Sequence, residues 1–325
     1  MLKVVARAPA KLNLTFEIVG ELPDGYHEVS TLMQAIDIED ELTFEFAPAS
    51  ELSVSLQCSS GTTDGGAASG GFPLDDSNLI VKAARLFLST RGERNGLAAR
   101  VTVDKQIPIA AGLAGGSADA AATMVALNYH YGHPFSPEEM LALAGKLGAD
   151  VPFCLEGGMR IGRGRGDELE AVGQAGKLHF VVVKPRNLAI STAWVYGAYD
   201  EWLSEEESPD TGKRDGWTPP DMVGAVAALR GGDLETATGC FGDDLEPVVF
   251  SHHPELARLK AALLALGAWC CHLTGSGPTL YAVVPDREAA HAMRRRFLEG
   301  HGGSFDVDFL MAKSVDFGAR LVGER

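Results

Sequence analysis

A glycine-rich stretch at residues 108–121, Pro-Ile-Ala-Ala-Gly-Leu-Ala-Gly-Gly-Ser-Ala-Asp-Ala-Ala, has the composition of an anion-binding loop. Its three glycines leave backbone N–H groups unshielded by a Cβ atom, and such groups can turn toward a negatively charged ligand. Strong helix formers follow as far as Asn128, with Ser117 as the expected N-cap, so the loop leads into a helix N-terminus. Because unpaired N–H groups and the positive end of a helix dipole meet there, the stretch predicts a phosphate site.

The loop by itself does not decide between phosphate binding and tight packing. It lacks the Lys-Ser/Thr pair that ends a Walker A loop, and its glycines do not have the Gly-x-Gly-x-x-Gly spacing of a dinucleotide fold. Loops rich in glycine and alanine also precede helices for packing reasons alone, so both interpretations stay open.

A lysine and an aspartate far apart in the sequence could supply the charges that phosphoryl transfer needs. Lys11 shares the polar face of an alternating strand, residues 7–20, with Asn13. Asp150 stands just beyond a helix that opens with a capping box at residues 136–139. A carboxylate can accept the proton of a hydroxyl, and an ammonium group can neutralise phosphate oxygens. Taken singly, each has a plainer interpretation: Asp150 as a turn or capping residue, and Lys11 as a solvated strand lysine.

The composition narrows the class of protein. A chain of 325 residues that is 46% hydrophobic can bury a sizeable core, and its length fits two domains better than one. The formal net charge of −16 argues against a nucleic-acid partner, so a polyanionic ligand has to be held locally by backbone amides, a few lysines and a metal ion. No apolar run reaches the roughly 18–20 residues of a membrane span, and the N-terminus has no signal-peptide core. These features predict a cytoplasmic protein without membrane association.

Neither the cysteines nor the histidines form a metal-binding pattern. The five cysteines are odd in number and lack Cys-x-x-Cys spacing, and Cys270 and Cys271 are adjacent, so reduced core thiols are expected. His252 and His253 have no further ligand at regular spacing, which favours a surface pair.

The strand and helix patterns are segregated within each half of the chain, which indicates an α+β fold. Turn residues at 23–25 present Tyr26 and His27 directly after the first strand. Residues 59–71 are expected to form a mobile loop and residues 204–220 an exposed insertion. The other predicted strands are 31–38, 42–46, 52–57, 100–104, a hairpin at 159–172, 179–184, 269–273, 279–284 and 305–312, and the predicted helices are 78–90, 136–148, 192–203, 221–229, 254–266 and 286–298.

Five motifs, in matching order, resemble those of the GHMP kinases, the family of galactokinase, homoserine kinase and mevalonate kinase. The glycine-rich stretch resembles the phosphate loop of that family, and its doubled glycine before the serine is similar to the branch of diphosphocytidyl-methylerythritol kinases. Residues 8–14 and 23–28 together resemble the first motif of this branch, and Asp-Gly-Tyr-His is its most specific part. Residues 76–84, 146–153 and 273–279 resemble its other motifs. The resemblance implies a two-domain fold, with a ribosomal-protein-S5-like N-terminal domain over residues 1–173 and a ferredoxin-like C-terminal domain over residues 174–325.

The resemblance also implies the reaction. ATP would phosphorylate the 2-hydroxyl of diphosphocytidyl-methylerythritol, a cytidine diphosphate, in the non-mevalonate isoprenoid pathway. Asp150 is then the general base, and Lys11 lies beside it and steadies the developing charge. The residues implied to bind ATP are Asn78, Pro108, Gly112, Leu113, Ala114, Gly115, Gly116 and Ser117.

For the acceptor, the resemblance implies that Tyr26 stacks on the cytosine ring and that His27 meets its hydrogen-bonding edge. Tyr196 falls where the family has a second aromatic ring, although a tyrosine on a helix is also a common core residue. Asn13 would contact the methylerythritol hydroxyls or phosphate; otherwise it is a strand-edge asparagine. The remaining substrate contacts are Thr192, Gly275 and Ser276.

Three residues depart from the family pattern. Ala114 replaces the middle glycine of the loop, which should stiffen the loop and leave its amides usable. Ala118 replaces a frequent second serine, whose hydroxyl related kinases offer to Mg²⁺, so the metal contact falls to Ser117 or to water. Asp243 stands where an asparagine is common.

Three other functions stay open on the sequence. A GHMP kinase that acts on mevalonate, homoserine or a sugar needs no cytosine clamp, so its activity would survive replacement of Tyr26. A nucleotide-binding regulator that lost catalysis is disfavoured by the intact pair of Lys11 and Asp150, and an RNA-binding protein by the net acidity. The oligomeric state is left open.

Overall fold

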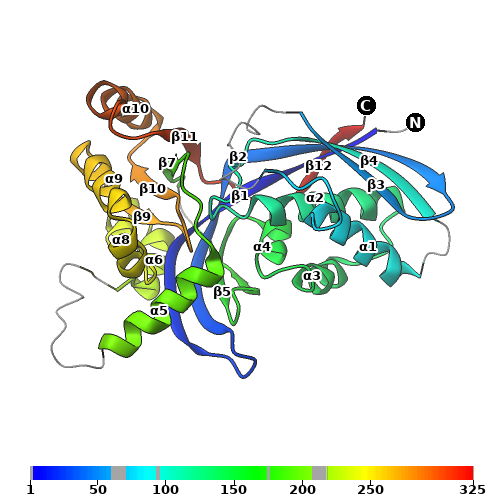
Figure 1. Cartoon of the computed structure of the whole chain (residues 1–325), viewed down its shortest axis with the longest axis horizontal. Coiled ribbons are helices and arrows are strands. Elements are labelled where there is room, and N and C mark those ends of the chain that lie inside the picture. The colour runs from blue at the N-terminus through cyan, green and yellow to red at the C-terminus, as the bar shows by residue number, and fades with distance from the viewer. Residues whose placement is uncertain are drawn as a thin grey trace.

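Two long antiparallel strands, β1 (Lys3–Glu21) and β2 (His27–Ala49), run through both halves of the molecule (Figure 1). The computed structural model describes residues 3–59, 71–92, 96–173, 176–206, 217 and 219–324. β2 continues through both of the strands predicted at 31–38 and 42–46, with irregular pairing that lets the hairpin bend. The polar residues between these segments do not form a turn, because Asp40 is fully buried within the strand.

β1 and β2 belong to the larger of two sheets, in which the strand order is β12-β1-β2-β4-β3. β5 pairs with β2, β6 pairs with β5, and the short β8 pairs with β1. The pairs β3–β4 and β1–β8 are parallel, and the others are antiparallel. The bounds are β3 Ser53–Cys58, β4 Gly96–Asp104, β5 Met159–Arg163, β6 Glu168–Ala171, β8 Gly242–Asp243 and β12 Arg320–Glu324.

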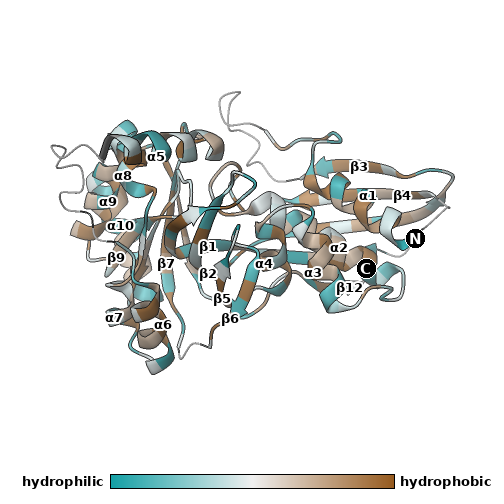
Figure 2. Ribbon diagram, turned by 90° about the horizontal axis from the view of Figure 1, so that it is seen from below, coloured by the Kyte–Doolittle hydropathy of each residue, from teal (hydrophilic) through white to brown (hydrophobic). Residues whose placement is uncertain are grey.

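Helices α1 to α4 cover one face of this sheet (Figure 1). α2 is apolar on most of its sides and buries every residue from Ala118 to Met124, as expected of a helix packed both on a sheet and among other helices. Its hydrophobic colouring in Figure 2 agrees with this central place. The glycine-rich loop is therefore anchored to the core at its C-terminal end. The bounds are α1 Leu79–Arg91, α2 Gly115–His130, α3 Pro137–Gly145 and α4 Asp150–Glu156.

The second sheet is antiparallel and has the strand order β11-β7-β10-β9. α9 packs against β9 and β10, and α10 packs against β7, β10 and β11. The strands are β7 His179–Pro185, β9 Cys270–Leu273, β10 Leu280–Val284 and β11 Val307–Lys313. The helices of this half are α5 Thr192–Glu206, α6 Met222–Gly231, α7 Leu234–Thr238, α8 Glu246–His252, α9 Pro254–Ala265 and α10 Arg287–His301.

β1 connects the two sheets. The buried hydroxyl of Tyr281 on β10 donates to the backbone oxygen of Leu14 at 2.9 Å, and β8 pairs with Thr15 and Phe16. The last strand, β12, returns from the second half to pair with β1. A division of the chain at residues 173 and 174 thus assigns to the second domain two strands, β8 and β12, that belong to the first sheet.

The α+β class is confirmed, and local signals located several elements well. Ser136 and Glu139 form the predicted capping box, although α3 ends at Gly145 rather than at the predicted Gly148. α4, α7, α8, β8 and β12 were not predicted. Most of the predicted loop 59–71 and insertion 204–220 lies outside the described residues. Within the described segments, no helix is both long and apolar enough to cross a bilayer, and the cytoplasmic location stays a prediction.

Candidate active site

A cavity of about 330 Å³ lies between the glycine-rich loop and the start of α1. Residues 77–79 and 108–116 line it, together with Phe72, Pro73, Lys105 and Asp119. The lining includes every residue predicted to bind ATP except Ser117. Its volume lies within the usual range of small-molecule sites. The fold therefore brings Asn78 and the loop together, as the nucleotide prediction requires.

The N-cap of α2 is Ala114, so the prediction of Ser117 as the N-cap is wrong. α2 begins at Gly115, and Ala114 adopts a left-handed φ of 57°, a conformation that costs an L residue about 1–2 kcal/mol. Alanine has no polar side chain, so the first N–H groups of α2 have no side-chain cap. Side chains of Asn78 and Ser136, in contrast, cap α1 and α3. The uncapped start of α2 can thus receive an anion.

At Gly112 the glycine-rich loop of residues 108–121 meets a second glycine-rich loop, residues 273–279. Its φ is +73°, and a Cβ atom at this position would lie 2.7 Å from the backbone oxygen of Thr274 and 3.1 Å from that of Gly277. On the other side, the backbone N–H of Lys11 donates to the oxygen of Leu113 at 3.3 Å. The loop is therefore held between β1 and residues 273–279.

Gly112→Ala is expected to raise the KM for ATP about tenfold or more, because the new methyl group displaces either this loop or the backbone at Thr274. Steady-state kinetics with varied ATP measures this effect. Gly132→Ala is the matched control, since Gly132 has the same φ of +73°, but a Cβ atom there would have no atom of the described residues within 4 Å. Equal KM values for ATP in the two variants would contradict the prediction.

Lys11 and Asp150 lie together, as the sequence predicted. The Nζ atom of Lys11 is 3.5 Å from Oδ1 of Asp150 and donates to Oδ1 of Asn13 at 2.6 Å. Lys11 is only 6% exposed, so the alternative of a solvated strand lysine is wrong. The Asp150 side chain is 40% exposed, which leaves its carboxylate open to a ligand.

Asp150 is the first residue of α4, a helix that contacts both α2 and β1. The positive end of a helix dipole favours an ionised carboxylate in the first turn. The sequence suggested a turn or cap at this point, whereas the helix begins with the aspartate itself. The packing of α4 against α2 and β1 holds Asp150 beside Lys11.

Asn13 is fixed by hydrogen bonds from three directions. Its backbone N–H donates to Oγ1 of Thr274 at 3.0 Å, its Nδ2 donates to Oγ1 of Thr31 at 2.7 Å, and its Oδ1 accepts from Lys11. Gly275, at φ +58°, lies so close that a Cβ atom there would be 3.1 Å from Oδ1 of Asn13. The second glycine loop therefore lies directly against the Lys11 cluster.

Two buried acidic residues near the start of α8 hold this second loop. Oε1 of Glu246 accepts the backbone N–H of Leu273 at 2.7 Å, and its Oε2 accepts from Lys260 at 2.7 Å. Burial opposes ionisation of Glu246, but its interactions with His272 and Lys260 outweigh that effect and lower the pKa. The carboxylate can thus stay charged while it anchors β9.

Asp243 is completely buried, and its Oδ1 accepts the backbone N–H of Leu245 at 2.9 Å. Burial raises its pKa well above 3.8, and the nearby carboxyl groups of Glu246 and Asp244 add to the effect. Burial thus disfavours the negative charge by which Asp243 differs from the asparagine of the family.

Four of the residues predicted to bind the acceptor form two pairs, each with one member on α5. The ring centroids of His27 and Tyr196 are 4.7 Å apart, and Oγ1 of Thr192 lies 3.0 Å from Oγ of Ser276 on the second glycine loop. Burial raises the pKa of the Tyr196 hydroxyl, which keeps it neutral. Tyr26 is 58% exposed and has the guanidinium carbon of Arg165 4.0 Å from its ring centroid. The long β1–β2 hairpin thus carries His27 to α5 (Figure 1).

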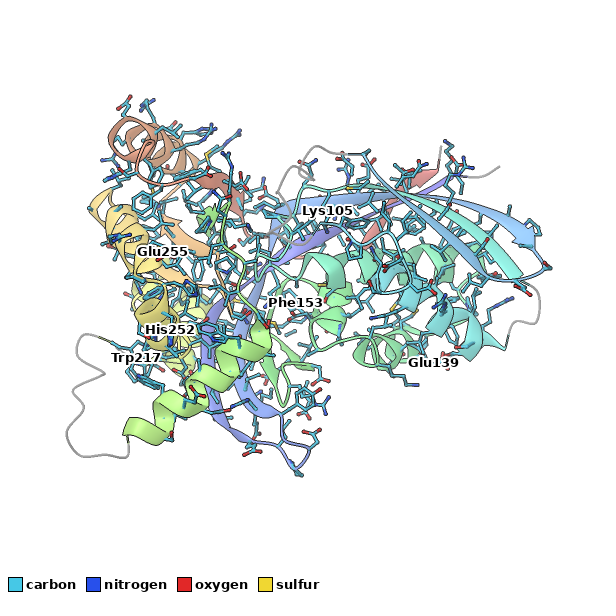
Figure 3. All side chains as sticks on the ribbon, in the orientation of Figure 1. Lys105, Glu139, Phe153, Trp217, His252 and Glu255 are labelled. Atoms are coloured by element: carbon cyan, nitrogen blue, oxygen red, sulfur yellow. The ribbon has the colours of Figure 1, made fainter. Side chains whose placement is uncertain are left out.

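A buried cluster of Lys105, Asp40 and Asp119 was missed by the sequence analysis. Nζ of Lys105 donates to Oδ2 of Asp40 and, at 2.8 Å, to Oδ2 of Asp119. Oδ1 of Asp40 accepts the backbone N–H groups of Gln106 and Ile107. Lys105 lies near the middle of the molecule below the long strands (Figure 3). Asp119, a charged residue within an otherwise apolar predicted helix, was the available signal. Its pairing with Lys105 and Asp40, which lie just outside the predicted strands, depends on the tertiary fold.

Comparison with known proteins agrees with this geometry. The models of the GHMP kinases N terminal domain and the GHMP kinases C terminal domain match residues 78–158 and 225–301. A 4-diphosphocytidyl-2-C-methyl-D-erythritol kinase from Pelotomaculum thermopropionicum is 38% identical over 90% of this chain and 93% of its own. A solved structure of 4-(cytidine 5'-diphospho)-2C-methyl-D-erythritol kinase has a TM-score of 0.70 at 28% identity, covering 96% of this chain and 99% of that chain. A homoserine kinase from Cytophaga hutchinsonii has a TM-score of 0.72 at 21% identity, covering 98% and 97% of the two chains, and shows the shared fold alone.

The matched domains, the fold and the phosphate loop define a GHMP kinase, which is a phosphotransferase that uses ATP. Two relatives that match over nearly the full length identify a particular family within this class. The chain belongs to the family of 4-diphosphocytidyl-2-C-methyl-D-erythritol kinases.

Proposed function

We propose that this chain transfers the γ-phosphoryl group of ATP to the 2-hydroxyl group of 4-diphosphocytidyl-2-C-methyl-D-erythritol, in the non-mevalonate pathway to isoprenoid precursors. The observation that carries the proposal is the position of Lys11 Nζ, 3.5 Å from Asp150 and 2.6 Å from Asn13, where the two glycine-rich loops meet. The names of the relatives support the choice of acceptor.

Each group at this point has a role in an in-line transfer. The Asp150 carboxylate accepts the proton of the acceptor hydroxyl while the oxygen bonds to the γ-phosphorus and the bond to the ADP oxygen breaks. The Lys11 ammonium group stabilises the negative charge on the transferring oxygens. The N–H groups of the loop and of the uncapped start of α2 hold the phosphates. Positioning and charge neutralisation account for most of the catalysis of such a reaction.

The nucleoside half of ATP occupies the cavity beside Asn78 and residues 108–116, and its phosphates point toward α2. Mg²⁺ in kinases keeps several waters and takes few protein ligands besides the phosphates. Within the described residues, no group of three His, Cys, Asp or Glu side chains could hold a metal alone, which fits an ion that arrives with the triphosphate. The Ser117 hydroxyl, in the first turn of α2, or a water would contact the ion, which would neutralise phosphate oxygens.

The acceptor extends from Asp150 toward α5. Asn13 and the loop at Gly275 and Ser276 contact its methylerythritol and diphosphate part, and Thr192 holds Ser276 in place. The cytosine ring lies at the end of the β1–β2 hairpin with Tyr26, His27 and Tyr196. Aromatic stacking of this kind contributes about 1–3 kcal/mol per base.

Release of ADP by the purified protein, with Mg²⁺-ATP and each candidate acceptor, tests the proposal. Release that requires 4-diphosphocytidyl-2-C-methyl-D-erythritol supports it. Release with mevalonate, homoserine or a sugar instead would keep the kinase class and refute the acceptor. No release of ADP with any acceptor would favour a nucleotide-binding regulator without catalytic activity.

Tyr26→Ala is expected to raise the KM for the cytidine acceptor about tenfold, because it removes one stacking face, and to leave the KM for ATP unchanged. Tyr26→Phe keeps the ring and is the matched control. Both Michaelis constants are measured by varying one substrate at saturation of the other. An unchanged acceptor KM in Tyr26→Ala would remove Tyr26 from the cytosine site.

A further inference from the structure

His27 is held by a carboxylate that the sequence analysis did not identify. Its Nε2 lies 2.7 Å from Oδ1 of Asp200 on α5, although the two residues are 173 positions apart. The ring packs on Tyr196, and the centroid of Tyr199 lies 6.4 Å away in an edge-on orientation. The His27 side chain is 19% exposed and that of Asp200 is 57% exposed. The imidazole is therefore fixed by packing on its face and by Asp200 at one nitrogen.

This contact determines which ring nitrogen carries the proton. A nitrogen lone pair 2.7 Å from a carboxylate oxygen would be repelled, so Nε2 carries a hydrogen and donates it to Asp200. Neutral imidazole has only one N–H group, and Nδ1 is then an acceptor. Without Asp200, the neutral ring could place its proton on either nitrogen.

An acceptor at Nδ1 distinguishes two pyrimidines that have the same shape. Cytosine presents an amino group at C4, which donates a hydrogen bond, whereas uracil presents a carbonyl oxygen there, which accepts one. A ring nitrogen with a lone pair accepts a hydrogen bond from the cytosine amino group and is repelled by the uracil oxygen. Sites that hydrogen-bond one substrate group discriminate strongly against an analogue that leaves them unpaired.

We propose that Asp200 is a positioning residue that fixes the His27 tautomer and thereby makes the acceptor site select cytosine over uracil. This inference rests on the proposed function, in which the cytosine ring lies at His27. Asp200 touches no reacting atom, and its effect is on the choice of acceptor rather than on the phosphoryl transfer itself.

The test compares kcat/KM for the cytidine diphosphate acceptor and its uridine counterpart at pH 8. In Asp200→Ala, the cytidine-to-uridine ratio is expected to fall at least about tenfold, with the KM for ATP unchanged. Asp200→Asn keeps an oxygen that can accept from Nε2 and should stay within about threefold of the wild-type ratio. Glu201→Ala is the matched control, since it removes a carboxylate from the next position of the same helix.

Several outcomes overturn the inference. If Asp200→Ala keeps the wild-type ratio, or if it lowers kcat/KM for both acceptors equally, Asp200 has only a structural role. If Asp200→Asn loses selectivity as much as Asp200→Ala, the tautomer argument is wrong. If the wild-type protein uses neither acceptor, the proposed function fails and this inference fails with it. Wild-type activity combined with an unchanged ratio in Asp200→Ala refutes the Asp200 inference alone.

Discussion

Asp150→Asn is expected to lower kcat about 10²–10⁴-fold, the usual contribution of a general base, while the KM for ATP stays near its wild-type value. The amide has nearly the shape of the carboxylate but cannot accept the proton of the acceptor hydroxyl. In the proposed function the nucleotide lies in the cavity of the glycine-rich loop, whose lining does not include Asp150, so its binding should depend little on this side chain. Initial rates of ADP release at saturating acceptor measure the loss.

Two controls separate catalysis from folding in this experiment. Glu156→Gln removes another carboxylate from α4, one that pairs with Arg160 at 3.1 Å, and should retain most of the activity. The partly exposed side chain of Asp150 supports little of the core, so the thermal midpoint of Asp150→Asn should match the wild-type value. A variant that retains more than about a tenth of the wild-type kcat would exclude Asp150 as the base.

The parts of the fold that the sequence predicted correctly are those determined by neighbours in the chain. Ser136 caps α3 because Glu139 is three residues away, and Asn78 caps α1 through the N–H of Ile80. The start of α2 was misplaced because Ala114 adopts a left-handed conformation that its residue type disfavours. Contacts with the rest of the fold evidently outweigh this local preference.

The parts of the site that the sequence did not predict are pairs of residues that only the tertiary structure brings together. Asp200 reaches His27 across 173 positions, and Asp40 reaches Lys105 across 65. Asp200, Asp40 and Lys105 read in the sequence as ordinary polar residues, and the motif that marks His27 does not indicate its partner. The motif residues Lys11 and Asp150 were found because a family resemblance links them, whereas their spacing in the chain carries no such information.

Asp243, which stands where the family has an asparagine, is a further residue whose state the sequence does not determine. From the sequence, an aspartate in place of asparagine adds a negative charge to the segment. In the structure, burial raises the pKa of this carboxyl group, and Oδ1 accepts the backbone N–H of Leu245. Residue type alone gives the charge in water, and the charge in the folded protein depends on burial.

Lys105→Met is expected to lower the free energy of unfolding by about 3–5 kcal/mol, because it leaves Asp40 and Asp119 buried without their cation. Urea denaturation followed by circular dichroism measures the change. Lys184→Met is the matched control. Lys184 is likewise only 5% exposed, but its Nζ donates to the backbone oxygen of Pro185, and burial lowers its pKa. An equal cost in the two variants would show that burial of a lysine, rather than the carboxylate pair, is responsible.

The loss of unfolding free energy in Lys105→Met should depend on pH in a direction set by Asp119. Burial raises the pKa of Asp119 above 3.8, Lys105 opposes that shift, and Asp40 adds to it. A carboxyl group with a raised pKa in the folded state keeps a proton that the unfolded chain releases, so its contribution to stability is complete at low pH. That contribution is lost as the pH rises toward the raised pKa, by at most about 1.4 kcal/mol per pH unit. Without Lys105 the raised pKa lies above the wild-type value of about 8, so the loss continues beyond that pH, and the difference between Lys105→Met and wild type should be larger at about pH 9.5 than at about pH 7. A difference that shrinks with rising pH would mean that Asp119 is not the group that Lys105 stabilises.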